Sequence, residues 1–336
     1  MDASTDVTKV VALGVSHWHL PNYLPPLLAR PDVRIVGVAD PDPSVAQRWG
    51  AELDCAWSAD YRDLVDRTRP GLAVVLGRHC DMAETGRFLA DAGVAFIMEK
   101  PCGLDSKEVG ALAEDVERAG VFAAVPLVWR RTDFTRVLRE NTGGDRFESM
   151  SLRIVSGHPD RYLRAGCPWM LDPALSGGGS TINLAIHLID LFAVLTGEPV
   201  ELMAAQMSNT SFGESIEDWS ALLLRAGDAV CTAESGLLYP AETGTYEVAF
   251  SIKTDRHYVQ ADFSRTVIRD HYGCTEFETP AANKPTYAAF VHDCVDRFRR
   301  GDPPPSGVAD VRSAMAVVDD AYRRAAPFDV SRLETP

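Results

Sequence analysis

The chain has 336 residues, of which 46% are hydrophobic and 24% are charged, and its formal net charge is −15. The length favours two domains over one, and the composition is ordinary for a globular protein. Nucleic acids and anionic membrane surfaces bind clusters of lysine and arginine, so the acidic balance argues against both as partners. The longest apolar stretches, such as residues 121–129, are too short to span a membrane.

The expected compartment is the cytoplasm. The first six residues lack the basic region and the apolar core of a secretory signal. The seven cysteines are scattered, odd in number and without a C-x-x-C pair, which indicates free thiols in a reducing environment.

The first third of the chain alternates short apolar strands with helical patterns. This alternation with short loops predicts α/β structure with a doubly wound parallel sheet, as one domain over residues 1–125. The predicted strands cover residues 9–14, 33–39, 72–76 and 94–98, with another near 122–128, and the predicted helices cover 44–53, 61–68, 81–92 and 106–119.

The pattern changes after about residue 126. Strand-like alternation with longer connections favours an α+β domain with an open, mostly antiparallel sheet over residues 126–336. The predicted strands cover residues 153–156, 219–225, 230–235, 246–254 and 259–263, and the predicted helices cover 181–196, 287–300 and 308–325.

The tripeptide Glu99-Lys100-Pro101 follows the apolar run at residues 94–98. Open α/β sheets bind ligands beyond the carboxyl ends of their strands, which is where Lys100 is expected. Pro101 keeps Lys100 out of the α region and makes a cis peptide possible. We interpret the tripeptide as a rigid segment that directs the Lys100 ammonium group toward a ligand at the sheet edge. The alternative is a strand end that is charged without a functional reason.

The segment after the first strand is the expected phosphate loop of a dinucleotide site. Of the usual G-x-G-x-x-G pattern, only the first glycine, Gly14, is present. Asp40 ends the second strand, where a carboxylate can accept hydrogen bonds from the adenosine ribose and repel the 2′-phosphate of NADP. This favours NAD, although an aspartate before Pro41 is also a common turn residue.

Several histidines raise the alternative of a metal site. His17 and His19 are two residues apart and could ligate a metal together with His79 or Cys80. Their spacing ties no third ligand to them, so polar residues around a nucleotide are the preferred interpretation and no metal is expected.

A second group of polar residues follows the glycines at 177–179. On a helix, Asn183 and His187 are four residues apart and share a face, and Asp190 lies one turn further. Glycines let the entering backbone approach another chain segment or a ligand closely. A helical histidine is often a core or capping residue, but the aligned Asn183 and the glycines favour a functional one.

Together, the E-K-P tripeptide at 99–101 and the GGG-x(3)-[D/N]-x(3)-H-x-x-D block at 177–190 carry a resemblance. Trp169 before the block and the proline-rich turn at 301–305 also fit it. The chain resembles the Gfo/Idh/MocA family of NAD(P)-dependent oxidoreductases, which act mostly on sugars, cyclitols and related polyols. The resemblance covers nearly the full length.

The resemblance implies a Rossmann domain followed by a substrate-binding domain, with hydride transfer between nicotinamide and a secondary alcohol or ketone. It implies that Lys100 contacts substrate and nicotinamide, that His187 acts as acid and base, and that Asn183 positions the substrate. It also implies a homo-oligomer, a dimer or tetramer, formed through the open sheet. The expected cofactor-binding residues are Gly14, Ser16, His17, Asp40, His79, Glu99 and Lys100, and the expected substrate-binding residues are Lys100, Trp169, Asn183 and His187.

The chain departs from the family pattern in three places. Asn183 stands where the family usually has aspartate, residues 77–82 replace the usual T-P-N-x-x-H, and the phosphate loop lacks its later glycines. Two alternatives therefore stay open: a hydrolase or lyase that recycles bound NAD, and a non-catalytic ligand-binding member. Further candidates for the substrate pocket, each also compatible with core or surface, are Trp129, Arg130, Arg131, Arg161 and Tyr162.

Overall fold

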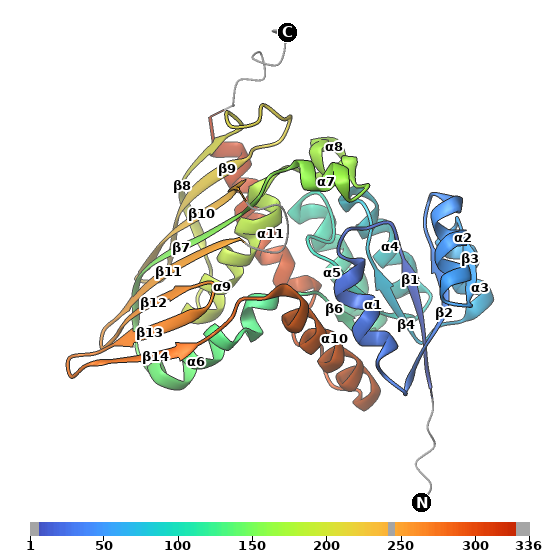
Figure 1. The fold of residues 1–336 in the computed structure, drawn as a ribbon, viewed down its shortest axis with the longest axis horizontal. Coiled ribbons are helices and arrows are strands. Elements are labelled where there is room, and N and C mark those ends of the chain that lie inside the picture. Colours follow the sequence, from blue (N-terminus) through green and yellow to red (C-terminus); the bar gives the residue numbers. More distant parts are fainter. Residues whose placement is uncertain (1–6, 241–245, 327–336) are drawn as a thin grey trace, which may run out of the picture. The chain divides into compact units, whose positions relative to one another are not determined.

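The computed structural model describes residues 7–240 and 246–326, and its internal contacts divide the chain into two units (Figure 1). The change of unit at Pro126 lies beside the predicted boundary. The segment Tyr287–Ala309, predicted to belong to the second domain, groups instead with the first unit. The first unit contains the chain up to Pro126, Ala165–Cys167 and Tyr287–Ala309, and the second contains Leu127–Arg164, Pro168–Thr286 and the chain from Asp310.

The first unit is built on a six-stranded parallel sheet with the order β3-β2-β1-β4-β5-β6. The predicted doubly wound sheet is confirmed. The order reverses between β1 and β4, and ligands of such sheets bind at this point, beyond the carboxyl ends of the strands. The strands are β1 (Thr8–Leu13), β2 (Val33–Ala39), β3 (Ala56–Ser58), β4 (Leu72–Val75), β5 (Ala95–Met98) and β6 (Ala123–Ala124).

Aspartate side chains start three helices of this unit. Asp42, Asp60 and Asp105 each accept a backbone N–H from the first turn that follows them, which satisfies donors that the helix itself cannot. The helices are α1 (Leu20–Leu28), α2 (Pro43–Glu52), α3 (Tyr61–Thr68), α4 (His79–Asp91), α5 (Ser106–Ala119) and, much later in the chain, α10 (Asn283–Arg300).

Helix α10 groups with the first unit because aromatic side chains hold it there. The ring of Tyr287 packs edge-on against Tyr23 of α1, and Phe298 packs in the same way against Phe122. These contacts join segments more than 170 residues apart, so the helical pattern predicted for residues 287–300 gave no sign of where the helix packs.

The second unit contains an eight-stranded sheet, whose strands Figure 1 shows side by side. Only β7 and β10 pair in parallel among the described neighbours, so the prediction of a mostly antiparallel sheet is confirmed. From edge to edge the strands are β14 (Cys274–Glu278), β13 (Arg265–Arg269), β12 (Tyr258–Asp262), β11 (Glu247–Thr254), β7 (Phe147–Gly157), β10 (Ala229–Tyr239), β9 (Trp219–Ala226) and β8 (Glu201–Ser208).

Helix α9 (Ile186–Thr196) packs against β7, β9 and β10 of this sheet, and its residues from Ile186 to Phe192 are buried. The helical run Pro173–Thr196 is long and apolar enough to cross a membrane, but 78% of its most apolar window is buried in the protein. Packing in the core therefore accounts for its apolar side chains. The other helices of the unit are η1 (Val128–Arg131), α6 (Asp133–Thr142), α7 (Asp160–Arg164), η2 (Pro168–Leu171), α8 (Pro173–Ser176), η3 (Thr181–Ala185) and α11 (Val308–Arg324).

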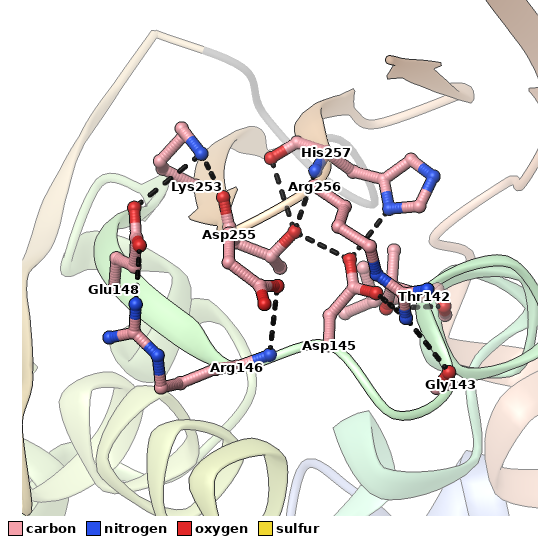
Figure 2. Close-up of polar contacts among 11 residues, drawn as sticks. Thr142, Gly143, Asp145, Arg146, Glu148, Lys253, Asp255, Arg256 and His257 are labelled. Carbon is pink, nitrogen blue, oxygen red and sulfur yellow. Dashed lines mark hydrogen bonds and ion pairs between the residues drawn. The ribbon is translucent and has the colours of Figure 1, made fainter. Parts of the chain in front are cut away.

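A buried carboxylate ties α6 and β7 to the turn between β11 and β12 (Figure 2). Asp145 lies 2.6 Å from both Thr254 Oγ1 and His257 Nδ1, and its other oxygen contacts Arg256. Burial alone raises the pKa of Asp145, but the hydrogen bonds from His257, Thr254 and Arg256 outweigh it and lower that pKa.

We expect Asp145→Asn to lower the free energy of unfolding by about 2 kcal/mol, because a buried ion loses its charge-assisted hydrogen bonds. Thermal unfolding measures the change as a melting temperature lower by several degrees. Glu148→Gln is the matched control from the same cluster, since Glu148 is half-exposed and its ion pairs with Arg146 and Lys253 lie at the surface. An equal decrease in the free energy of unfolding in both variants would contradict the stabilising role given to the Asp145 carboxylate.

Candidate active site

Lys100 and Glu99 follow β5 at the carboxyl edge of the parallel sheet. Both side chains are buried, with exposed fractions of 3% and 1%. The peptide bond between Lys100 and Pro101 is cis, the isomer that the sequence made possible. A lysine therefore stands at the sheet edge where ligands of this topology bind, as predicted from the tripeptide.

The carboxylate of Glu99 is surrounded by donors from three other segments. Tyr23 Oη donates to Oε2 over 2.6 Å, His19 Nδ1 lies 3.0 Å from the same oxygen, and the Tyr287 hydroxyl lies 3.4 Å away. The Lys100 amide donates to Oε1 over 3.1 Å. Burial alone raises the pKa of Glu99, but the charges of His19 and Lys100 and the hydrogen bonds outweigh it, so this pKa lies well below its usual range.

The loop after β1 depends on Gly14 and Asp40. Gly14 has a φ of +77°, and a Cβ there would lie 1.8 Å from the Leu76 carbonyl oxygen, so glycine is required. Asp40 is buried at the end of β2, where Oδ2 accepts the Ser16 amide over 2.7 Å and Oδ1 accepts the Asp42 amide over 3.1 Å. Asp40 thus holds the loop, and its contact with a ribose stays a prediction.

The loop offers few backbone donors to a pyrophosphate. The amides of Gly14 and Val15 donate to Ala39, and those of His17, His19 and Leu20 donate within the loop. The residues fit the other parts of a dinucleotide, because Asp40 carries acceptors at the end of β2 and Lys100 a cation at the end of β5. A dinucleotide would therefore be held with less help from loop amides than G-x-G-x-x-G provides.

His17 and His79 are both buried in the first unit. Burial lowers the pKa of His17 well below its usual value, and the neighbouring His19 lowers it further, so His17 is neutral at pH 7. Within residues 7–240 and 246–326, no three His, Cys, Asp or Glu side chains gather as a metal-holding group.

In the second unit, Asn183 and His187 lie on one helical run, as predicted, but its first turn is not α-helical. Residues Thr181–Ala185 form a π-helix in which the Ile186 amide donates to Thr181, five residues earlier. Such turns are rare and occur frequently at functional sites. The expectation of a regular i, i+4 face is therefore wrong in detail, because Asn183 belongs to the π turn and His187 to α9. Both side chains are buried.

Glu217, which the sequence patterns did not indicate, holds the start of this helical run. Its carboxyl group accepts the amides of Gly179 and Thr181 over 2.9 and 2.8 Å, and the Tyr322 hydroxyl over 2.8 Å. A Cβ on Gly179 would lie 2.0 Å from the Glu217 carbonyl oxygen, and one on Gly178 would lie 2.0 Å from Tyr322 Oη. The glycines are thus needed for a close approach to the protein itself.

Two candidates for the substrate pocket have structural roles. Arg130 forms a bidentate ion pair with the buried Asp190 and a further one with Asp310, so Asp190 serves to bind an arginine. Burial raises the pKa of Asp190 although Arg130 opposes this. Trp129 packs edge-on against Phe250 in the core.

The remaining candidates differ in their surroundings. Tyr162 is buried and contacts Asn183 directly, with 2.6 Å between Tyr162 Oη and Asn183 Nδ2, and Arg161 contacts Tyr162. Trp169 is half-buried in η2, and Arg131 is exposed. The contact between Tyr162 and Asn183 joins two elements 21 residues apart, so no sequence pattern could have revealed it.

We expect Glu99→Gln to lower the free energy of unfolding by about 2 kcal/mol near pH 7, because charge-assisted hydrogen bonds are lost. The pKa of Glu99 is lowered on folding, so its carboxylate stabilises the protein above about pH 4.3, the value in an unfolded chain, and less as the pH falls below that. Urea unfolding between pH 3 and 7 should show the gap between wild type and variant shrinking below about pH 4. Glu84→Gln, on the exposed face of α4, is the control. A stability difference between wild type and Glu99→Gln that does not change with pH would contradict the lowered pKa of Glu99.

Comparisons with known proteins agree with this architecture. Residues 8–126 match the model of the oxidoreductase family with an NAD-binding Rossmann fold, and residues 150–254 match the GFO/IDH/MocA C-terminal domain. The levoglucosan dehydrogenase of Pseudarthrobacter phenanthrenivorans is 25% identical over 195 residues, which are 56% of this chain and 48% of that protein. The chain therefore spans about half the length of this curated relative.

Solved structures share the fold over nearly the whole chain. An oxidoreductase from Agrobacterium radiobacter, in complex with NAD⁺, L-tartaric acid and magnesium, has a TM-score of 0.84 and 16% identity, covering 97% of this chain and 99% of its own. A 3-ketoreductase from Actinomadura kijaniata, in complex with NADP and TDP-benzene, has a TM-score of 0.80 and 14% identity, with coverages of 96% and 99%. With both domain models matched in order, and with Lys100 and His187 on the elements that their motifs predicted, the chain belongs to the Gfo/Idh/MocA family of oxidoreductases.

Proposed function

We propose that the protein is an NAD-dependent dehydrogenase or ketoreductase that acts on a secondary alcohol or ketone of a sugar, cyclitol or related polyol. The observation that carries the proposal is the buried Lys100, held beside the Glu99 carboxylate at the ligand-binding edge of a Rossmann sheet. Membership of an oxidoreductase family supports the reaction type, and the relative that acts on levoglucosan supports a sugar-like substrate.

The chemistry follows from the residue types. Nicotinamide, when bound, supplies the exchange of a hydride with the substrate carbon. Lys100 lowers the free energy of the alkoxide that develops on the substrate oxygen. His187 takes the hydroxyl proton in the direction of oxidation and returns it in reduction, and Asn183 accepts a hydrogen bond from a neighbouring hydroxyl.

NAD is proposed as the preferred cofactor because of Asp40. A carboxylate at the end of β2 can accept hydrogen bonds from ribose hydroxyls and repels a 2′-phosphate. The two solved structures described above hold NAD⁺ in one case and NADP in the other, so calorimetric titration with both dinucleotides is the direct measurement.

We expect Lys100→Ala to lower kcat by roughly 100-fold or more, with only a modest change in the Kd for NAD, because Lys100 acts mainly on charge that develops in the transition state. The measurement is NADH formation with levoglucosan, D-glucose and myo-inositol as probes. Lys107→Ala is the control, since Lys107 lies on the exposed face of α5. Unchanged turnover in Lys100→Ala would remove the lysine from the mechanism.

Two other outcomes select the alternatives. Conversion of substrate without net NADH formation would identify a hydrolase or lyase that recycles bound NAD. Failure of both NAD and NADP to bind at millimolar concentration would identify a non-catalytic member, to which the scarcity of loop donors after β1 points.

We also propose that the protein forms a homo-oligomer through the open sheet and works in the cytoplasm. Met203, Leu223 and Val230 are exposed on three adjacent strands of the second sheet, which supports self-association. All seven cysteines are free thiols, which supports a reducing compartment. Sedimentation at micromolar concentration should show a dimer or tetramer, and Leu223→Glu should shift it toward the monomer; a monomeric wild type would contradict the first proposal.

A further inference from the structure

The side chains of Asn183 and Tyr162 form a buried pair. Asn183 Nδ2 lies 2.6 Å from Tyr162 Oη, and the exposed fractions of the two residues are 3% and 1%. Tyr162 belongs to α7, and Asn183 belongs to the π turn that precedes α9. A polar contact this short between buried groups fixes both side chains, because breaking it would leave polar atoms without water to replace the bond.

Arg161 holds the phenol group of Tyr162 in place. Its Nη2 donates to Tyr162 Oη over 2.9 Å, and its guanidinium carbon lies 4.8 Å from the centre of the Tyr162 ring. Its other terminal nitrogen contacts Ser156 Oγ at the end of β7, so the guanidinium group is fixed as well. Arginine can only donate hydrogen bonds, so the phenol oxygen acts as an acceptor toward it.

The contact of Asn183 Nδ2 with the phenol oxygen gives the orientation of the Asn183 carboxamide in the structure. The Tyr162 oxygen accepts from Arg161 on one side and from the Asn183 NH₂ group on the other. With its NH₂ group directed at Tyr162, Asn183 turns its carbonyl oxygen away from the phenol. A carboxamide has one donating end and one accepting end, so its orientation decides which one it presents to another group.

We propose that Tyr162 is a positioning residue that, supported by Arg161, fixes the Asn183 carboxamide with its Oδ1 presented to a substrate hydroxyl. The inference rests on the proposed function, since it assigns Asn183 to substrate binding. It explains how an asparagine serves where the family usually has aspartate. A carboxylate accepts hydrogen bonds at both oxygens and has no wrong orientation, whereas a carboxamide must be held in one of two.

The first test observes the pair without any enzyme activity. In the full-length protein, the ¹⁵N side-chain amide signal of Asn183 can be assigned by its loss in Asn183→Asp. We expect hydrogen exchange at this amide to be at least roughly tenfold faster in Tyr162→Phe than in wild type, since about 1.4 kcal/mol of hydrogen bonding corresponds to that factor. An exchange rate unchanged by Tyr162→Phe would overturn the proposal, whatever the reaction proves to be.

The second test asks whether the pair acts on the substrate as one unit. We expect Tyr162→Phe to lower kcat/KM by roughly tenfold and to leave the Kd for NAD unchanged. In the Asn183→Ala background it should cost nothing further, because no carboxamide remains to be oriented. Losses that multiply in the double variant would show that Tyr162 acts independently of Asn183 and would overturn the proposal.

Tyr246→Phe is the matched control, because Tyr246 donates a hydrogen bond to the Ala281 carbonyl in the same unit and is assigned no role at the site. It should change neither the exchange of Asn183 nor kcat/KM. Failure of the proposed function is distinguishable: wild type would then not convert the probe alcohols at all, while the exchange experiment would still report on the pair.

Discussion

The close approach of the Gly178–Gly179 backbone to Glu217 is the constraint on which the functional residues of the second unit depend. No other residue type leaves room for the Glu217 carbonyl oxygen and the Tyr322 hydroxyl, because a Cβ at either glycine would overlap one of them. The carboxyl group of Glu217 then accepts the amides that begin the helical run. This fixes the register of the π turn, and with it the positions of Asn183 and His187.

A buried carboxyl group also organises the first unit, but its electrostatics are opposite. Glu99 is surrounded by His19, Lys100 and the Tyr23 hydroxyl, and its pKa is lowered. Glu217 receives its hydrogen bonds from backbone amides and hydroxyl groups, and burial raises its pKa in spite of them. Neutral dipoles satisfy a buried carboxyl group without matching its charge, whereas nearby cations also stabilise the ionised form. The first arrangement keeps an anion beside Lys100, and the second is a rigid point of attachment.

Hydrogen bonds in the structure accompany two of the departures from the family pattern, the phosphate loop without its later glycines and Asn183. Asp40 accepts a hydrogen bond from the Ser16 amide. The residue expected to bind the ribose therefore also holds the phosphate loop, which lacks the later glycines of the family pattern. The loop amides are used within the protein, which moves the recognition of a dinucleotide toward side chains at the sheet edge. Asn183, neutral where a carboxylate is usual, lies against a phenol that an arginine holds in place. Both the altered phosphate loop and Asn183 therefore take part in hydrogen bonds that a sequence comparison alone does not show.

The sequence by itself determined both kinds of sheet and the placement of Lys100 at a strand end and of His187 on a helix. These follow from apolar periodicity, glycine and proline positions, and two spaced motifs, all of which are local. It missed β3, β8, β13 and β14, which lie at or beside the edges of the two sheets. Only the tertiary structure decided which distant groups meet: α10 with the first unit, Glu217 with the glycines, and Tyr162 with Asn183. Such contacts depend on side chains brought together by the whole fold, and no spacing along the chain encodes them.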